Sequence, residues 1–388
     1  MKVGIDITAT IYNRGVSRYT FNLAKNLNKE IGISLSLFGS SLRERELLKN
    51  ISEDILGNNN HFPAKDPNFG PEYKILPYPQ KIMEKMWQLG LNPVSKYLKG
   101  LDVFHSWDWI QPPDKNIAIV STIHDLAILK YPETAHPQIL KSHKRSWEKI
   151  KQNKSHLIAV SRATKKDIMD FLGYPSYMIH VVHEALPEEF KKSSDAITEE
   201  IALNIKNQLA ISKPYILFVG TREPRKNLLR LIEAWQPLAN EFELIVAGSE
   251  GWDQIEEKSK KFDYEPRFLG KVSDRQLSVL YSYASVFAYP SLYEGFGLPI
   301  LESFYLGTPV LTSNNSGMLE VAGNAAELID PLSVEEITNG LKKILNENHE
   351  EQQKRMQRMI IRQQMFDWKK VAQETICVYK KAIEDFEK

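Results

Sequence analysis

The sequence predicts an α/β protein made of two doubly wound domains. Its 388 residues are enough for two domains that each bury a core of their own. Short runs of apolar and β-branched residues alternate with longer segments of helical periodicity in both halves, which is the rhythm of βαβ units. The apolar runs are continuous rather than alternating, so we expect strands that are covered on both faces, as in parallel sheets.

The expected elements follow this rhythm along the chain. Strands are expected in the first half at 2–7, 33–38, 102–106, 117–123, 156–160 and 179–182, and in the second half at 215–220, 242–248, 286–291, 309–313 and 326–330. The clearest helical patterns lie at 17–27, 162–172, 227–235 and 274–284. Ligands of such sheets bind at the carboxyl ends of the strands, which predicts a binding site in a cleft between the two domains.

The domain boundary is predicted from a change in composition. Residues 184–214 are charged and only weakly periodic, and a new strand begins directly after them. We therefore predict an N-terminal domain over 1–185, an interdomain connection with a helix over 186–213, and a C-terminal domain over 214–365. A long helix over 366–388 is expected to cross back toward the first domain.

Composition excludes several classes of protein. The net charge of +1 gives no global reason to expect nucleic-acid binding. Cys377 is the only cysteine and cannot form an internal disulfide, which favours a reducing compartment. The chain opens on an expected strand rather than a signal peptide, and no apolar run approaches the roughly 20 residues that span a bilayer. We expect a cytoplasmic protein, with peripheral contact to an anionic membrane left open.

The stretch "EGFGLPILE", 294–302, carries the strongest indication of a binding site. Gly295 and Gly297 let the backbone turn sharply after a strand, and Pro299 suits the first position of the helix that follows. Bare N–H groups at a helix start attract anions and hydroxyl-rich ligands. Glu294 precedes this helix and Glu302 lies in about its first turn, so the two carboxylates address different parts of one elongated ligand. The alternative is an ordinary helix start with a favourably placed glutamate.

The residues from "PSLYEGFGLPILESF" onward resemble the C-terminal signature of the retaining glycosyltransferases of family GT4, which have the GT-B fold. Glu294 and Glu302 match the E-x7-E element of that family. The resemblance extends over nearly the whole chain and includes "TIHDLAILKYPE" and "FVGTREPRKNLLRLIEAW". Within the family, these segments are most similar to mannosyltransferases and rhamnosyltransferases of bacterial surface-polysaccharide assembly.

The resemblance gives the basic pair in "VGTREPRKNL" a role. A strand is expected to end at Gly220, Asn227 is expected to cap the next helix, and Arg225 and Lys226 precede that cap. In the family, the corresponding pair neutralises the departing nucleotide diphosphate, and fixed cations aimed at developing charge lower a barrier directly. Many relatives have an arginine where this chain has Thr221. The alternative interpretation of the pair is a solvated loop.

Two positions in the N-terminal half complete the expected site. His124 lies at the carboxyl end of an expected strand, and the resemblance implies that it contacts the donor sugar. The alternative is a hydrogen-bonded structural histidine. Asp125 is interpreted as a structural cap of the next turn. Gly15, in the first strand-to-helix loop, permits close approach of a phosphate or sugar, although a tight turn explains it as well.

Weaker signals remain open. His105, Trp107 and Trp109 are expected in a loop, where their rings either stack on an acceptor sugar or pack in the core. The basic segment 141–154 is either a solvated helix face or a surface for anionic lipid or a lipid diphosphate. Val272 lies in the segment whose backbone contacts the nucleotide base in the family. We see no spaced His/Cys cluster and no D-x-D pair, so no metal and no cofactor are expected.

These observations predict a retaining, metal-independent glycosyltransferase. Its substrates would be a nucleotide sugar, for which GDP-mannose is the best guess, and a saccharide or lipid-linked acceptor. The alternatives are a dTDP-rhamnose or UDP-N-acetylhexosamine donor, and a non-catalytic protein that binds a nucleotide sugar. The predicted catalytic residues are His124, Glu294, Arg225 and Lys226. The predicted donor-binding residues are Gly15, Gly220, Thr221, Arg225, Lys226, Val272, Glu294, Gly295, Phe296, Gly297, Leu298 and Glu302.

Overall fold

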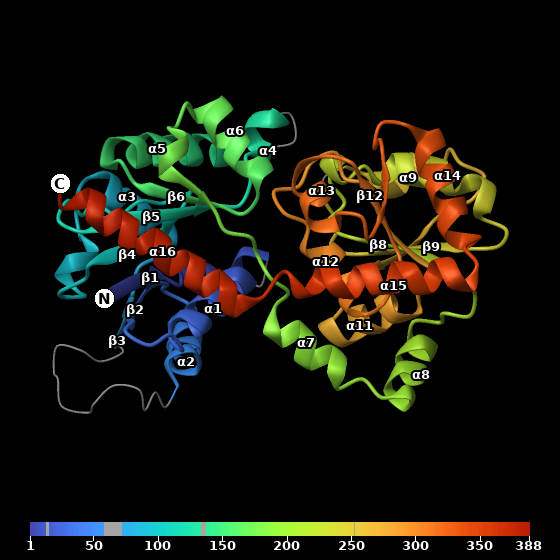
Figure 1. Ribbon diagram of the computed structural model, residues 1–388, viewed down its shortest axis with the longest axis horizontal. Coiled ribbons are helices and arrows are strands. Elements are labelled where there is room, and N and C mark those ends of the chain that lie inside the picture. Colours follow the sequence, from blue (N-terminus) through green and yellow to red (C-terminus); the bar gives the residue numbers. More distant parts are fainter. Residues whose placement is uncertain (13–14, 58–71, 133–136, 252) are drawn as a thin grey trace. The chain divides into compact units, whose positions relative to one another are not determined.

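The computed structural model divides the chain into two compact units, each built on a parallel sheet (Figure 1). Unit 1 comprises Met1–Glu184 and Asp367–Lys388, and unit 2 comprises Ala185–Phe366. The structure describes residues 1–12, 15–57, 72–132, 137–251 and 253–388. The predicted α/β class with two doubly wound domains is confirmed.

The sheet of unit 1 has seven strands in the described part of the chain, in the order β3-β2-β1-β4-β5-β6-β7. The strands are β1 (Lys2–Asp6), β2 (Ser34–Ser40), β3 (Glu72–Leu76), β4 (Val103–Trp107), β5 (Ala118–Ile123), β6 (His156–Ala159) and β7 (Ile179–Val181). The helices are α1 (Gly15–Leu27), α2 (Arg45–Leu56), α3 (Gln80–Gln88), α4 (Ala127–Lys130), α5 (Pro137–Asn153), α6 (Arg162–Leu172) and α16 (Trp368–Phe386). Every strand pair is parallel.

The sheet of unit 2 has six parallel strands among the described residues, in the order β10-β9-β8-β11-β12-β13. The strands are β8 (Tyr215–Val219), β9 (Glu243–Ala247), β10 (Arg267–Gly270), β11 (Val286–Tyr289), β12 (Val310–Ser313) and β13 (Glu327–Ile329). The helices are α7 (Glu188–Asp195), α8 (Glu199–Gln208), α9 (Leu228–Trp235), α10 (Ile255–Ser259), α11 (Asp274–Tyr283), α12 (Leu298–Tyr305), α13 (Ser316–Ala322), α14 (Val334–Leu345) and α15 (His349–Gln364).

The central strands form because their apolar runs are buried on both faces. All residues of β1, β2, β4 and β5 are buried, as are those of β11 and β12. The strand order changes direction beside β1 in one sheet and beside β8 in the other, because β4 and β11 lie next to them. The carboxyl ends at such a reversal point are where doubly wound sheets place their ligands.

The C-terminal helix α16 completes unit 1 rather than unit 2. It packs along α1 and against β5, as Figure 1 shows within that unit. Tyr379 of α16 is fully buried, and its hydroxyl lies 2.6 Å from Nδ1 of His105 on β4. The helix is therefore held by a buried polar contact as well as by its apolar face.

Two features differ from the sequence-based expectation. The segment 186–213, expected as an interdomain connection with one helix, forms two helices, α7 and α8, that belong to unit 2, where α7 packs on α11. Strands β3 and β10 were not expected, and each lies at the edge of its sheet. Edge strands keep a solvent-facing side, so their residues do not form the continuous apolar run that identifies a central strand.

Candidate active site

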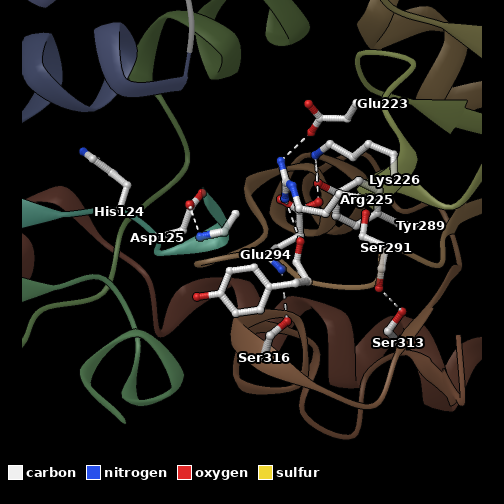
Figure 2. Close-up of polar contacts among 12 residues, drawn as sticks. His124, Asp125, Glu223, Arg225, Lys226, Tyr289, Ser291, Glu294, Ser313 and Ser316 are labelled. Atoms are coloured by element: carbon white, nitrogen blue, oxygen red, sulfur yellow. Dashed lines mark hydrogen bonds and ion pairs between the residues drawn. The ribbon is translucent and has the colours of Figure 1, made fainter. Parts of the chain in front are cut away.

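A cluster of three charged side chains lies in the loops that follow β8 and β11 of unit 2 (Figure 2). The Glu294 carboxylate bridges both cations: Oε2 accepts a hydrogen bond from Nη1 of Arg225 at 2.8 Å, and Oε1 accepts one from Nζ of Lys226 at 2.7 Å. Nη2 of Arg225 also donates to Glu223 at 2.5 Å, and Nζ of Lys226 donates to the Tyr289 hydroxyl at 2.9 Å. Residues 69 positions apart in the sequence thus form one ion-pair network.

The backbone holds the two loops together. The Leu292 N–H donates to the carbonyl of Arg225, and Nη1 of Arg225 donates to the carbonyl of Tyr293. The Glu294 N–H donates to the Ser316 hydroxyl, and its carbonyl accepts from the N–H of Gly317. Hydrogen bonds to α13 therefore hold the Glu294 backbone in place, independently of the cations that its side chain binds.

Glycine is required where α13 meets the loop before α12. A Cβ on Gly317 would lie 2.3 Å from the carbonyl oxygen of Gly295, a distance that no side chain tolerates. Gly297 has φ of +126°, a conformation that other residues rarely adopt, and it stands immediately before α12. The two glycines of the loop are thus buried backbone positions in contact with α13.

The electrostatics of the cluster keep Glu294 ionised. Burial raises the pKa of its carboxyl, but the charges of Arg225 and Lys226 and their hydrogen bonds lower that pKa to about 2. Burial, with the Glu294 charge close by, raises the pKa of the Tyr289 phenol far above its ordinary value, so this hydroxyl is neutral. The Lys226 ammonium has three N–H donors, and the described residues take two of them. One remains for a ligand.

Glu302, the second carboxylate of the predicted motif, lies deeper in the structure. Helix α12 begins at Leu298, so Pro299 is its second residue and Glu302 lies in its second turn rather than its first. The carboxylate is buried and accepts a hydrogen bond from the Tyr281 hydroxyl at 3.0 Å. The structure thus places Glu302 on the body of α12 and Glu294 in the loop before it, in two separate polar environments.

The prediction that Asn227 caps α9 through its side chain is wrong. Asn227 occupies the N-cap position, but its backbone is left-handed, with φ of +60°, and its side chain makes no cap hydrogen bond. The side-chain amide instead donates to the carbonyls of Pro290 and Pro331. Asn227 therefore braces the loop after β11, which is the loop that carries Glu294.

The residues between β8 and the basic pair are arranged for close backbone packing. A Cβ on Gly248 would lie 2.0 Å from the carbonyl oxygen of Gly220, so the loops after β8 and β9 touch through their main chains. Thr221 is exposed. Arg222 is buried, forms an ion pair with Glu256 and lies over the ring of Phe268. Its side chain is thus engaged away from the Glu294 cluster.

The other predicted donor-binding residues of unit 2 are distributed around α11 and α12. Phe296 is buried and its ring packs edge-on against Phe366, with centroids 5.6 Å apart. Leu298 is the half-buried first residue of α12. Val272 is half-buried and precedes Ser273, which caps α11 in a capping box with Gln276. The donor-binding role of these three positions stays a prediction.

In unit 1, His124 follows β5 and is paired with a residue that the sequence did not indicate. Its Nδ1 lies 2.8 Å from Oε1 of Glu184, which is buried. Burial lowers the pKa of His124, but the hydrogen bond and charge of Glu184, with Asp108 and Asp125 adding to them, bring the pKa above its ordinary value. The Nε2 atom is enclosed and has no hydrogen-bond partner among the described residues.

Two aromatic rings pack against His124, and the neighbouring Asp125 has a structural role. The Tyr19 ring lies edge-on to the imidazole at 4.8 Å, and Trp107 lies nearly parallel to it at 6.2 Å. Oδ1 of Asp125 accepts a hydrogen bond from the Ala127 N–H at 2.8 Å. Asp125 is therefore the structural cap of the turn before α4, as its residue type suggests.

The expected aromatic loop is in fact the end of a strand. His105 and Trp107 belong to β4 and are fully buried: His105 lies between Thr122 and Tyr379, and Nε1 of Trp107 donates to the carbonyl of Asp6. These two rings therefore pack in the core, and their burial excludes stacking on a sugar. Trp109, beyond the strand, is only half-buried.

The predicted ligand contact of Gly15 and the predicted lipid contact of the basic segment 141–154 stay predictions. Gly15 is the exposed first residue of α1, and a Cβ there would meet nothing within 4 Å, so packing does not require glycine. Asn13 and Arg14, in the same predicted loop, lie outside the described residues. Residues 141–153 form most of α5, on which Lys141, Lys144 and Arg145 are exposed.

The described residues contain neither a membrane-spanning helix nor a metal-binding cluster. None of their helices combines the length and the apolar character that crossing a membrane requires. Nor do His, Cys, Asp and Glu gather anywhere in the described ranges in a group of three or more that suits a metal ion.

Comparison with known families gives matches in both units. Residues 13–190 match the family described as "Glycosyltransferase Family 4", and residues 202–363 match "Glycosyl transferases group 1". Between them the two matches include most of both units.

Individual relatives and structures agree with these matches. The chain is 29% identical to O-antigen chain mannosyltransferase B of Escherichia coli over 94% of this chain and 96% of that protein. It is 28% identical to O-antigen chain mannosyltransferase RfbU of Salmonella typhimurium over 54% of this chain and 56% of that protein. The crystal structure of Anabaena Alr3699/HepE in complex with UDP and glucose superposes with a TM-score of 0.68 at 15% identity, over 98% of this chain and 100% of that one. This last likeness shows the fold.

Proposed function

The chain belongs to the family 4 glycosyltransferases and has their GT-B fold, and on that premise we propose that it transfers mannose from GDP-mannose to a saccharide acceptor. The acceptor would be a growing glycan, free or lipid-linked, in surface-polysaccharide assembly. The O-antigen mannosyltransferases among its relatives support the sugar and the pathway class. The observation that carries the proposal is the bridge from Glu294 to Arg225 and Lys226 beside the start of α12.

The cluster suits the chemistry of a departing nucleotide diphosphate. Arg225 and Lys226 are already held in position by Glu294, so their orientation costs little when a ligand arrives. As the glycosidic bond to the diphosphate breaks, negative charge grows on the phosphate oxygens, and the two cations together with the N–H groups near Gly297 stabilise it. We assign the diphosphate to Arg225 and Lys226, and the ribose hydroxyls to Glu302.

We assign the transferred sugar to Glu294 and, as the family resemblance implies, to His124. Glu294 has a carboxylate that stays ionised and accepts hydrogen bonds from sugar hydroxyls. The protonated form of His124, favoured by Glu184, disperses charge near the transferred sugar. Family membership favours retention of the anomeric configuration without a covalent intermediate on the protein. In that mechanism the leaving diphosphate takes the proton of the incoming acceptor hydroxyl on the same face of the sugar.

Metal independence and the place of the reaction are part of the proposal. Arg225 and Lys226 supply the positive charge that a divalent cation gives to other sugar transferases. We place the protein in the cytoplasm, in peripheral contact with the membrane through the basic face of α5 (Pro137–Asn153). Reversing the charge of Lys141, Lys144, Arg145 and Lys151 should reduce sedimentation with anionic liposomes, and unchanged sedimentation would remove the membrane contact.

A donor screen tests the central claim. The full chain is incubated with GDP-mannose, dTDP-rhamnose and UDP-N-acetylglucosamine, and thermal stability and nucleotide release are measured with and without acceptor. A donor at 100 times its dissociation constant should add about 2.7 kcal/mol of stability. Acceptor-dependent release of GDP supports the proposal. Stabilisation by a nucleotide sugar with no transfer to any acceptor would favour a binding protein instead.

A further inference from the structure

We infer that a groove of unit 1 between α3 and α5 binds a neutral saccharide, namely sugar residues of the acceptor that lie away from the reacting hydroxyl. The inference rests on the proposed function and specifies which surface of unit 1 holds the acceptor chain. The groove has a volume of about 320 Å³ and is lined by residues of both helices and of the loop after β4. That volume is at the lower end of the range for small-molecule sites.

The walls of the groove combine an aromatic face with hydrogen-bonding groups. Trp87 and Trp109 line it, together with the side-chain amide of Gln88. Gln111 lines it too, but its amide is hydrogen-bonded within the core to Ser106, Ser121 and the Trp107 carbonyl. The indole N–H of Trp87 donates to the carbonyl of Asn92, so the rest of that ring presents carbon. Sugars have apolar C–H faces and a rim of hydroxyls, and a site of flat rings beside amides and charges matches both.

Trp109 supplies the ring that is accessible. It is half-buried and stacks on the fully buried Trp107, with centroids 5.9 Å apart and an interplanar angle of 15°. One face of the Trp109 ring is therefore covered by the core, and its position is fixed before any ligand binds. A fixed aromatic platform binds a ligand without first losing side-chain freedom.

A buried hydroxyl in the groove wall has no partner. Ser146, on α5, lines the groove and is 6% exposed. Its Oγ makes no hydrogen bond with any described residue. This oxygen is enclosed in the wall, so a ligand hydroxyl reaches it only when neighbouring side chains move.

The charges that line the groove indicate a neutral ligand. Arg145 and Lys149 are balanced by Glu84 and Glu148 on the same walls. Glu84 already accepts hydrogen bonds from Ser142 and Gln88. A groove without net charge has no electrostatic preference for a nucleotide or a lipid phosphate. Charged side chains of both signs hydrogen-bond well to sugar hydroxyls, which both donate and accept.

The groove shares an aromatic contact with the surroundings of His124. The fully buried Trp107 ring lies 6.2 Å from the His124 ring and 5.9 Å from the Trp109 ring. Asp108, beside Trp109, pairs with His143 of α5 at 3.3 Å and contributes to the raised pKa of His124. His124 and Trp109 therefore each lie beside the same core ring, and we place the preceding sugars of the acceptor at Trp109.

The test uses the full chain and two probes, α-linked mannotriose and methyl α-mannoside. Arg145 and Gln88 both line the groove, whereas Lys166, an exposed residue of α6 in the same unit, does not. In Arg145→Ala and Gln88→Ala, the KM for mannotriose as acceptor should rise roughly tenfold, as loss of a charged or neutral hydrogen bond implies. The rise for methyl α-mannoside should be smaller, and Lys166→Ala should match the wild type for both acceptors.

Direct binding separates this inference from the proposed function. Saturation-transfer NMR of mannotriose with the protein, without nucleotide sugar, should show contact that Arg145→Ala weakens and Lys166→Ala does not. If mannotriose binds in this way but the wild type transfers no sugar, the proposed function fails and the groove stands. If the wild type transfers mannose and Arg145→Ala and Gln88→Ala stay within twofold of it for mannotriose, the inference is overturned. Binding of phosphatidylglycerol vesicles that depends on Arg145, without saccharide binding, would overturn it too.

Discussion

The two units place their ionisable groups in opposite electrostatic situations. In unit 2, Glu294 lies between two cations, and its pKa falls to about 2. In unit 1, His124 lies beside Glu184, and its pKa rises above the ordinary value. Both arrangements favour the charged form of a buried group, but the first group is a carboxyl, whereas the second is an imidazole, the side chain whose ordinary pKa lies closest to neutral pH.

This difference separates fixed charge from adjustable charge. Glu294 stays ionised throughout the neutral range, so its hold on Arg225 and Lys226 suits a constant task such as presenting these cations to a diphosphate. His124 is of the residue type whose charge responds to pH, and Glu184 raises its pKa, so this histidine suits a pH-dependent role. His105, on the neighbouring strand, shows the opposite outcome for the same residue type. Burial lowers its pKa to about 3, with the His124 charge adding to that effect, so it is neutral in the core.

Glu294→Gln should give the largest effect on stability. Removing one charge of a buried network leaves Arg225 and Lys226 side by side with too little compensation, and such changes cost about 3 to 5 kcal/mol. The free energy of unfolding of the full chain, from urea denaturation, measures this cost. Glu233→Gln, at an exposed position of α9, serves as the control and should stay within about 0.5 kcal/mol of the wild type. Equal stability of the two variants would mean that the network contributes little.

The same variant has a pH signature. Because the pKa of Glu294 is lower in the folded protein than its ordinary value of 4.5, its stabilisation is fully present above pH 4.5 and is lost as the pH falls toward 2. The wild type should therefore lose more stability than Glu294→Gln between pH 4.5 and 2. Parallel stability curves over this window would contradict the low pKa of Glu294.

Lys226→Ala should give the next largest effect, on turnover. It removes a fixed cation and the N–H donor that the described residues leave available, and loss of one such donor at developing charge costs on the order of 10²-fold in kcat. Transfer from GDP-mannose measures the loss. Lys260→Ala, at an exposed position of the same unit, is the matched control. A Lys226→Ala enzyme within threefold of the wild type would rule out its role at the diphosphate.

The fold could be predicted further than the site. Continuous apolar runs such as 117–123 identify central strands, because burial on both faces is recorded in the residues themselves. β3 (Glu72–Leu76) and β10 (Arg267–Gly270) were missed because charged residues leave them only very short apolar runs, whereas the edge strands β7 and β13 were expected. The strand β4 was placed correctly but ended too early, since His105 and Trp107 are residue types as common in sites as in cores.

The site needed spatial information that no local pattern contains. Family resemblance singled out Arg225, Lys226 and Glu294. It did not indicate that one carboxylate bridges both cations, because this bridge forms only where two loops meet in the fold. Glu184 is 60 residues from His124 and had no motif to indicate it. Asn227 was misjudged because its residue type favours a cap, whereas its left-handed backbone turns the amide toward two proline carbonyls.

Glu184→Gln tests whether Glu184 controls the pKa of His124 in unit 1. Burial alone lowers the pKa of His124, and Glu184 is the main group that raises it, so the titration midpoint of His124 should fall in the variant. Proton NMR of the His124 ring measures the midpoint directly. Because the folded-state pKa is raised, the wild type should also lose the stability due to this pair as the pH rises above 6.5, and the variant should not.

The decline of activity at high pH should shift in the same direction as the His124 midpoint. If protonated His124 assists transfer, kcat of Glu184→Gln should decline at lower pH than that of the wild type. Glu46→Gln, at an exposed position of α2, should leave both the midpoint and the profile in place. An unchanged His124 midpoint in Glu184→Gln would show that Glu184 does not control the protonation of this histidine.

Removal of metal ions should give the smallest effect. The fixed cations of unit 2 already face the position assigned to the diphosphate, so a divalent cation would add charge where Arg225 and Lys226 supply it. Transfer from GDP-mannose should therefore stay within about twofold of its starting rate in excess EDTA. The informative comparison is with Lys226→Ala, because a cation that is redundant in the wild type can partly replace the missing ammonium. Partial rescue of Lys226→Ala by added Mg²⁺, with no gain for the wild type, would show that the lysine occupies the electrostatic place of a metal, whereas near-total loss of wild-type activity in EDTA would show that the two side chains are insufficient.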